Sequence, residues 1–251
     1  MEDPQSIALI KGTSECLVFD NATDRVNRFN YSTGEYLSSF ALPIAPAPSQ
    51  IIEPLPDGTF LSWGYLTSQL YRITATGGLL NSYSAPAGGS FVSAAGVGPS
   101  GEIYAAWVGT NKIHRYGING ATQGVSAVSG PFADGTQMNT NSAFGYFTQS
   151  SNTIYKFLPG NPATGIEAVT FAAGTSLFGV AMGHGDLTYA CGKDAAGAGV
   201  WVLNGATKTQ VGKFTPAGIT TPVHMAIVVA PEPTTMLALG AGIAALLRKR
   251  R

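Results

Sequence analysis

Few residues of the chain are charged, and this limits the partners that it can have. Of its 251 residues 11% are charged, with 14 basic against 14 acidic side chains. This balance leaves no basic surface for nucleic acid, so we expect no nucleic-acid partner. The two cysteines are too few for a disulfide scaffold; they form one bridge or remain two buried thiols, and we favour the thiols. The 32 glycines and 15 prolines predict many turns and short strands.

The first residues do not have the pattern of a secretion signal. Residues 1–5, Met-Glu-Asp-Pro-Gln, are acidic and have no basic region, apolar core or small-residue cleavage site. The last residues of the chain nevertheless have features of an exported protein. We therefore expect either that the true start lies upstream of Met1 or that export uses another route, and we favour the first.

A short pattern recurs five times in the body of the chain. In each copy a basic residue lies between apolar ones, and the copies are residues 25–29, 69–73, 112–116, 153–157 and, more weakly, 199–203. Their first apolar positions are 44, 43, 41 and 46 residues apart, which is close to the length of one four-stranded propeller blade. A two-sheet β-sandwich or a β-helix would not naturally produce this period. The sequence thus predicts an all-β propeller of five to six four-stranded blades over residues 5–229.

Other strands are predicted in register with this pattern. A glycine-led strand lies upstream of the pattern at residues 58–63, 101–107 and 185–191, with residues 16–20 as its counterpart in the first unit. Before each of these we expect a strand that lines the central channel, at residues 7–10, 50–55, 91–97, 132–138 and 177–182. Turn residues that tolerate positive φ follow the pattern and lead into outer strands such as residues 36–42 and 79–84.

The end of the body allows two blade counts, five or six. Residues 222–229 have the pattern of a channel strand for a sixth unit. A lone inner strand leaves an unpaired edge. Either further strands upstream of Met1 complete this blade, or five blades close with the last strand replacing or flanking the first.

The repeating unit resembles the NHL type of propeller repeat. In that repeat, a glycine-led strand runs into a polar turn and then into a strand of the form Arg-apolar-x-x-aromatic, and residues 16–40 are the closest copy. The resemblance extends loosely over residues 5–229. It implies a propeller fold.

Motifs for catalysis or metal binding are missing from the sequence. There is no phosphate-binding glycine loop with lysine, His-Glu-x-x-His, Cys-x-x-Cys, Gly-x-Ser-x-Gly or Asp-rich calcium loop. His184 and His224 lie in or beside channel strands, but two histidines do not complete a metal site. His114 occupies a slot filled elsewhere by large aromatic residues, which indicates packing. We expect no catalytic residues, no metal and no cofactor.

Two sets of residues are candidates for ligand binding. The basic residues of the pattern are Arg28, Arg72, Arg115 and Lys156. They form either a ring of cations for an acidic polysaccharide or, as we favour, structural cations that pack between blades and pair with a neighbour. Trp63, Trp107 and Tyr65 are candidate stacking platforms for sugars, although packing between blades is the favoured alternative. Trp201, Tyr104 and Tyr146 have the same two interpretations.

The last residues combine a rigid motif, an apolar run and a basic end. The motif is Pro231, Glu232 and Pro233, and the basic end is Arg248, Lys249, Arg250 and Arg251. As a helix, the 14 residues 234–247 would span about 21 Å, against about 30 Å for the hydrocarbon core of a bilayer. Long basic side chains extend that reach, and the positive-inside bias places them in the cytoplasm and the body outside. The segment therefore predicts a single transmembrane helix that holds the chain during export.

Residues 230–251 resemble the PEP-CTERM sorting signal of Gram-negative bacteria, through the Pro231-Glu232-Pro233 motif, the apolar helix and the terminal basic cluster. The resemblance implies recognition by an exosortase, a membrane enzyme that resembles a cysteine transpeptidase, and cleavage near the motif. It further implies an inner-membrane-anchored precursor that is delivered to the cell surface or outside the cell, often in organisms that make exopolysaccharide. An ordinary membrane anchor is the alternative.

Together these features predict an exported, non-enzymatic propeller that binds or scaffolds at the cell surface or in the extracellular matrix, with exopolysaccharide as a candidate partner. The alternative is a propeller-fold lyase or lactonase that acts on an extracellular glycan or a small ester. That activity needs carboxylates converging at one channel mouth, and the few candidates are Glu53, Asp57, Asp134 and Asp186. A third possibility is an assembly protein that recruits strands from a neighbour.

Overall fold

The fold is all-β. The computed structural model describes residues 3–42, 51–64, 67–98, 100–110, 112–125, 136–140, 145–148, 152–157, 167–183, 187–215, 217–220 and 226. Within these ranges the chain forms 20 strands and no helix. In particular, the described residues contain no helix capable of crossing a bilayer.

The strands form five consecutive groups of four. The first group is β1 (Pro4–Leu9), β2 (Glu15–Asp20), β3 (Arg25–Asn30) and β4 (Tyr36–Ala41). The second is β5 (Ile51–Pro54), β6 (Phe60–Trp63), β7 (Gln69–Ile73) and β8 (Leu79–Ser84). The third is β9 (Val92–Val97), β10 (Ile103–Trp107), β11 (Lys112–Tyr116) and β12 (Thr122–Val125). The fourth is β13 (Thr136–Thr140), β14 (Gly145–Thr148), β15 (Thr153–Phe157) and β16 (Glu167–Thr170). The fifth is β17 (Ser176–Met182), β18 (Leu187–Asp194), β19 (Gly197–Asn204) and β20 (Thr209–Phe214).

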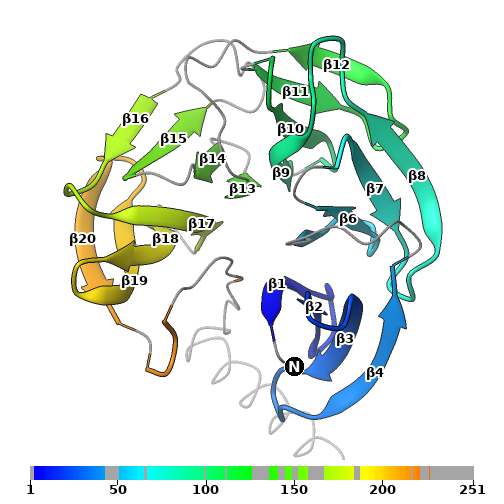
Figure 1. The fold of residues 1–251 in the computed structure, drawn as a ribbon, viewed down its shortest axis with the longest axis horizontal. Helices are drawn as coiled ribbons and strands as arrows, with labels where there is room; N and C mark the ends of the chain where they lie inside the picture. Colours follow the sequence, from blue (N-terminus) through cyan, green and yellow to red (C-terminus); the bar gives the residue numbers. More distant parts are fainter. Residues whose placement is uncertain are drawn as a thin grey trace, which may run out of the picture.

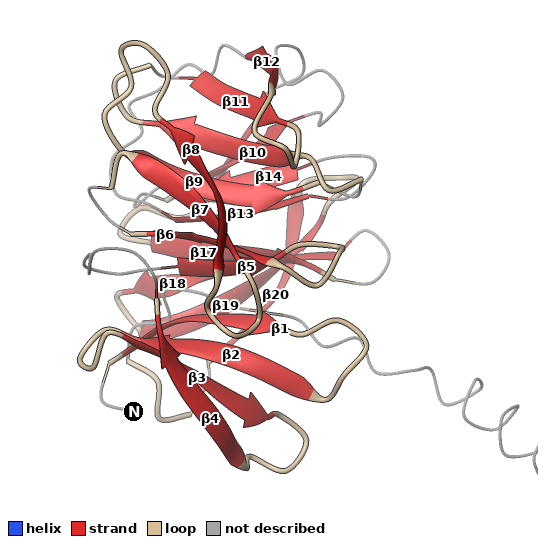
Figure 2. Ribbon diagram, turned by 90° about the vertical axis from the view of Figure 1, so that its right-hand side faces the viewer, coloured by secondary structure: helices blue, strands red, loops and turns tan. Residues whose placement is uncertain are grey.

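Each group is an antiparallel meander, here called a unit, and the units are arranged as a propeller. Figure 1 shows β1, β9, β13 and β17 toward the centre of the ring and the fourth strands at its rim, and Figure 2 shows the ring from the side. Contacts join β1 to β5, β5 to β9, β9 to β13 and β13 to β17. The described residues thus form a chain of units around a common axis.

The hydrogen-bonded sheets number four in the described part of the chain, because two units share one sheet. The third and fourth units join through a short parallel pairing of β9 with β13, at Ala94 with Thr136 and Ala95 with Gln137. The prediction of five to six separate blades is corrected accordingly: counted by sheets there are four blades, of which one holds two meanders. The expected sixth channel strand, residues 222–229, lies almost entirely outside the described residues, as does the predicted tail helix.

The repeat read from the sequence coincides with the strands. All five copies of the basic-apolar pattern lie on third strands, namely β3, β7, β11, β15 and β19. The expected outer strand 79–84 matches β8, and the expected outer strand 36–42 matches β4 to within a residue. The predicted channel strand 132–138 begins and ends too early, because β13 covers Thr136–Thr140. The 43-residue period is therefore confirmed as the spacing of four-stranded units.

Apolar side chains fill the seams between neighbouring units, because alternate residues of a strand face opposite sides of its sheet. Leu17 and Phe19 of β2 pack with Phe60 and Ile73 of the second unit. The largest cluster joins the second and third units, and it includes Leu61, Trp63, Leu70, Tyr83, Ile103, Trp107 and Tyr116. The second and third units thus use one face for the unit before and the other face for the unit after.

One turn shows how closely adjacent units approach. Gly77, in the turn between β7 and β8, has a φ of 89°. A Cβ atom built on it would lie 2.5 Å from the ring of Phe40 on β4. Glycine is therefore required there both by the left-handed backbone and by the neighbouring unit.

Candidate functional site

The four repeated cations occupy equivalent places at successive seams. In the strand register, Arg28 lies opposite Leu17, Arg72 opposite Leu61 and Arg115 opposite Tyr104. In the fourth unit, Lys156 on β15 lies opposite Tyr146 on β14. Leu17, Leu61 and Tyr104 pack toward the unit that follows, so the cations beside them share that face.

Arg28 forms an ion pair within its own unit. Its guanidinium bonds to the carboxylate of Glu15 at the start of β2, with Nε donating to Oε2 over 2.5 Å. Both side chains are partly buried. Arg28 is therefore a structural cation, as favoured from the sequence.

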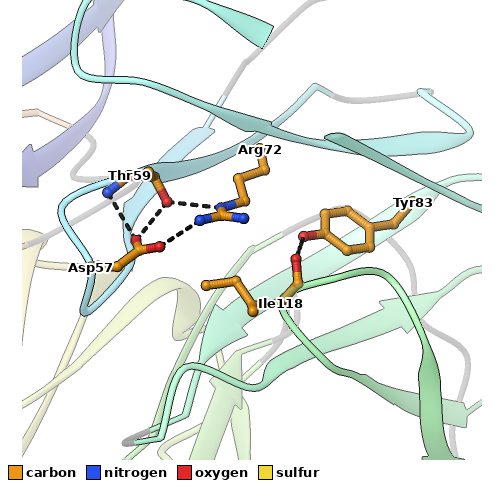
Figure 3. Close-up of polar contacts among 5 residues, drawn as sticks. All are labelled: Asp57, Thr59, Arg72, Tyr83 and Ile118. Carbon is orange, nitrogen blue, oxygen red and sulfur yellow. Dashed lines mark hydrogen bonds and ion pairs between the residues drawn. The ribbon is translucent and has the colours of Figure 1, made fainter. Parts of the chain in front are cut away.

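Arg72 is held by two partners from one turn (Figure 3). Its Nη2 donates to Oδ2 of Asp57 over 2.5 Å, and its Nε donates to Oγ1 of Thr59 over 3.0 Å. The backbone N–H and the hydroxyl of Thr59 also donate to Oδ1 of Asp57, over 3.0 and 2.6 Å. Partial burial raises the pKa of Asp57, but the hydrogen bonds from Thr59 and the charge of Arg72 outweigh it, so that pKa lies below its usual value.

A tyrosine bridges the same seam beside Arg72. Tyr83 of β8 donates from its hydroxyl to the backbone carbonyl of Ile118 over 2.8 Å, as Figure 3 shows. Ile118 belongs to the turn between β11 and β12, so the bond joins the second unit to the third. Tyr83 is almost fully buried, and burial raises its pKa.

The fourth cation reaches into the following unit. Nζ of Lys156 donates to the backbone carbonyl of Gly205 over 3.3 Å, which joins β15 to the turn after β19. In the fifth unit, Lys213 pairs with Asp194 and lies 5.0 Å from the ring centroid of Trp201. These cations too have partners within the fold.

Arg115 differs from the other three. Its Nε is buried and has no hydrogen-bond partner within the part of the chain that the structure describes. Glu102, two residues before the residue opposite Arg115, is engaged elsewhere: it accepts from the N–H of Ser100 over 3.0 Å and from the hydroxyl of Tyr104 over 3.3 Å. Among the ion pairs of the described residues, none includes Arg115.

The predicted stacking residues lie inside the fold as far as they are described. Trp63 is 1% exposed and Trp107 is fully buried, and both pack in the seam between the second and third units. Tyr65 lies outside the described residues. Trp201 is buried against Phe171, with ring centroids 6.1 Å apart. Packing accounts for this burial, and sugar stacking on Trp63, Trp107 and Tyr65 stays a prediction.

His114 is a buried neutral histidine. Its ring stacks on Tyr116, with centroids 6.3 Å apart, and its Nε2 has no partner within the described strands. Burial, and then the charge of Lys112, lower its pKa. The other two histidines, His184 and His224, lie outside the described residues. Within the described ranges no group of three His, Cys, Asp or Glu side chains is placed to hold a metal ion.

Both cysteines are free buried thiols. Burial raises the pKa of Cys16, and raises that of Cys191 to about 12. A thiol with such a pKa stays protonated at neutral pH and is a poor nucleophile. The interpretation as two thiols is therefore confirmed.

The acid candidates for a lyase or lactonase are only partly placed. Asp57 is engaged by Thr59 and Arg72, and Glu53 is buried on β5. Asp134 and Asp186 lie outside the described residues. The sequence analysis does not identify Asp57 and Glu15 as partners of the repeated cations, and spacing alone does not reveal them, because Glu102 lies as far before Arg115 as Glu15 does before Arg28 and forms no ion pair with it.

Comparison with known families identifies the end of the chain. Residues 229–251 match the PEP-CTERM protein-sorting motif, and this range contains Pro231, Glu232, Pro233 and the basic cluster from Arg248 to Arg251. The chain thus carries a signal of sorted, exported proteins, and the motif implies processing by an exosortase. These residues lie outside the described part of the structure. A search of curated proteins finds no match to the chain.

Solved structures with the same fold are β-propellers of diverse function. Virginiamycin B lyase from Staphylococcus aureus has a TM-score of 0.64 at 15% identity, over 86% of this chain and 70% of that one. A chain of a nidogen/laminin complex has a TM-score of 0.70 at 13% identity, over 88% and 83%. U3-55K has a TM-score of 0.66 at 10% identity, over 88% and 69%. At these identities the likeness establishes a β-propeller body and nothing about activity.

Proposed function

We propose that the chain is an exported binding or scaffold protein of the cell surface or extracellular matrix. The observation that carries this proposal is a sorting motif at residues 229–251 that follows a propeller body. In the proposed pathway, an apolar helix over residues 234–247 holds the precursor in the membrane, with Arg248 to Arg251 in the cytoplasm. An exosortase then cleaves near Pro231–Pro233, and the body reaches the surface or the medium.

The propeller body supplies the binding function in this proposal. A ring of packed units is a rigid disk whose turns and channel mouth present a fixed surface. Exopolysaccharide is the proposed partner, because the sorting motif resembles signals found in organisms that make it. Binding is favoured over catalysis because Asp57, one of the few acid candidates, is already engaged by Thr59 and Arg72.

A propeller-fold lyase or lactonase is the second candidate. Its support is the fold likeness to virginiamycin B lyase, at 15% identity. Release of an unsaturated product from a glycan, or hydrolysis of a small lactone, by the purified chain would favour it. Loss of that activity in Asp57→Asn would assign the acid.

Cell fractionation in the native host tests the proposal. The full chain, expressed with and without the host's exosortase gene, is followed by immunoblot in inner membrane, surface and medium. We expect surface or medium protein only when exosortase is present, and retention in the membrane for the double variant Pro231→Ala, Pro233→Ala. Pro222→Ala, outside the matched residues, is the control and behaves as the wild type. Delivery of the double variant to the surface would overturn the sorting role.

A further inference from the structure

Arg115 stands out among four equivalent positions of the repeat. Arg28, Arg72 and Lys156 each bond to an acid, a hydroxyl or a carbonyl group of the fold. The Nε of Arg115 is buried without a partner in the described residues. A buried donor without a partner costs stability, so retaining one in a repeat that elsewhere provides partners suggests a function for the group.

The outer strand beside Arg115 differs from that of the first two units. The residue opposite it on the outer strand β12 is Gly124, and a Cβ atom built there would have no atom within 4 Å. The same place beside Arg28 is taken by Ser38, and beside Arg72 by Asn81. The outer strand therefore carries no side chain beside Arg115, and a substituent at Gly124 would meet no other atom, whereas the first and second units carry a side chain there.

The groups on the inner side of Arg115 suit an anion with an adjoining hydroxyl. Tyr104, opposite Arg115 on β10, is fully buried and its hydroxyl donates to Glu102. Burial, and then the charge of Glu102, raise the pKa of Tyr104, so its hydroxyl stays protonated. The partly buried carboxylate of Glu102 can accept a hydrogen bond from a sugar hydroxyl.

We propose that the seam between the third and fourth units is a binding site for the carboxylate group of an acidic saccharide, with Arg115 as the residue that binds it. A guanidinium presents parallel N–H donors that match the two oxygens of a carboxylate. This inference rests on the proposed binding function and specifies the class of ligand, a uronic-acid glycan, and the residue that selects it. The paired cations at the other seams contribute structure and not binding.

Two arginine-to-methionine variants provide the test, since methionine keeps the apolar stem and removes the charge. Trigalacturonate is titrated calorimetrically into the full chain in mild detergent, with the uncharged galactose trisaccharide as the control ligand. We expect Arg115→Met to weaken trigalacturonate binding at least tenfold, and the matched variant Arg72→Met to change it less than about twofold. Binding of the acidic sugar also falls with added salt.

Thermal melting of the same variants separates binding from stability. Arg115→Met is expected to melt at or above the wild-type temperature, because it removes an unpaired buried donor. Arg72→Met is expected to melt lower, because it leaves Asp57 without its cation. A drop in Arg115→Met as large as that in Arg72→Met would overturn the proposal by showing a structural cation.

Failure of this site and failure of the proposed function have different signatures. Wild-type binding of trigalacturonate that survives in Arg115→Met overturns the site and leaves a binding function in place. No binding of trigalacturonate by the wild type overturns the uronate assignment. Surface delivery, measured by fractionation, decides the proposed function in either case.

Discussion

The second and third units use the same repeat position in different ways. In the second, Asp57 and Thr59 supply both acceptors for Arg72, and Tyr83 ties the seam to the next unit. In the third, the nearby Glu102 is bonded to Ser100 and Tyr104, and Arg115 has a buried, unpaired Nε within the described chain. The same repeat position therefore carries a cation that is bonded within the fold in the second unit and a cation with a buried Nε that lacks a partner among the described residues in the third.

The largest effect should come from the apolar core of the seam that contains Arg72. Trp107 is fully buried between the second and third units. We expect Trp107→Ala to lower the free energy of unfolding by about 3–5 kcal/mol, as measured by urea denaturation. The exposed Leu80→Ala on β8 is the control and should cost less than about 0.5 kcal/mol. A loss below about 1 kcal/mol for Trp107→Ala would contradict the packing described here.

The bond between Tyr83 and Ile118 should have the next largest effect. Tyr83→Phe removes the hydroxyl and leaves the Ile118 carbonyl without this donor, which costs about 1–2 kcal/mol. Tyr36→Phe, which makes the same change at an exposed tyrosine on β4 in the first unit, serves as the control. An unchanged denaturation midpoint for Tyr83→Phe would mean that the bond does not hold the units together.

Asp57 and Glu102 should contribute differently to stability, because Asp57 pairs with Arg72 and Glu102 is bonded to Ser100 and Tyr104. Asp57→Asn breaks the pair with Arg72 and should cost about 1 kcal/mol, whereas Glu102→Gln should cost less than about 0.5 kcal/mol because Glu102 has no ion pair with Arg115. Equal losses in the two variants would contradict the difference between the seams.

The pH dependence of that loss has a defined sign. The pKa of Asp57 is lower in the folded state than its unfolded value of about 3.9. The unfolded state therefore binds the proton more readily, so the contribution of the pair is present above about pH 4 and disappears as the pH falls through the folded pKa. The difference between wild type and Asp57→Asn should shrink accordingly in acid.

His114, on the face of the third unit that packs against the second, should give a small effect that depends on pH. Its folded pKa is lowered, so the unfolded chain binds the proton first as pH falls below about 6.5. We expect the free energy of unfolding of the wild type to fall between pH 6.5 and 5.5, and that of His114→Gln to fall less. An identical pH profile for the two proteins would show that His114 is not held neutral by the fold.

The sequence predicted the repeat well because two periods coincide in it. Alternation of apolar and polar residues marks the strands, and the 43-residue spacing places all five copies of the pattern on third strands. The sharing of one sheet by two units was not predictable, since a parallel pairing of two residues in β9 and β13 leaves no pattern. The different states of Arg72 and Arg115 also escaped prediction, because they depend on whether the acid upstream is taken by other donors.

The intact mass of the protein recovered from its native host, with its terminal peptides, tests the central claim of a sorted, exported propeller most directly. The account predicts a chain that ends near Pro231 to Pro233 when exosortase is present, and a chain that keeps Arg251 when the enzyme is deleted. An intact Arg251 in surface protein from the exosortase-positive host would contradict it and would make the C-terminal segment an ordinary anchor.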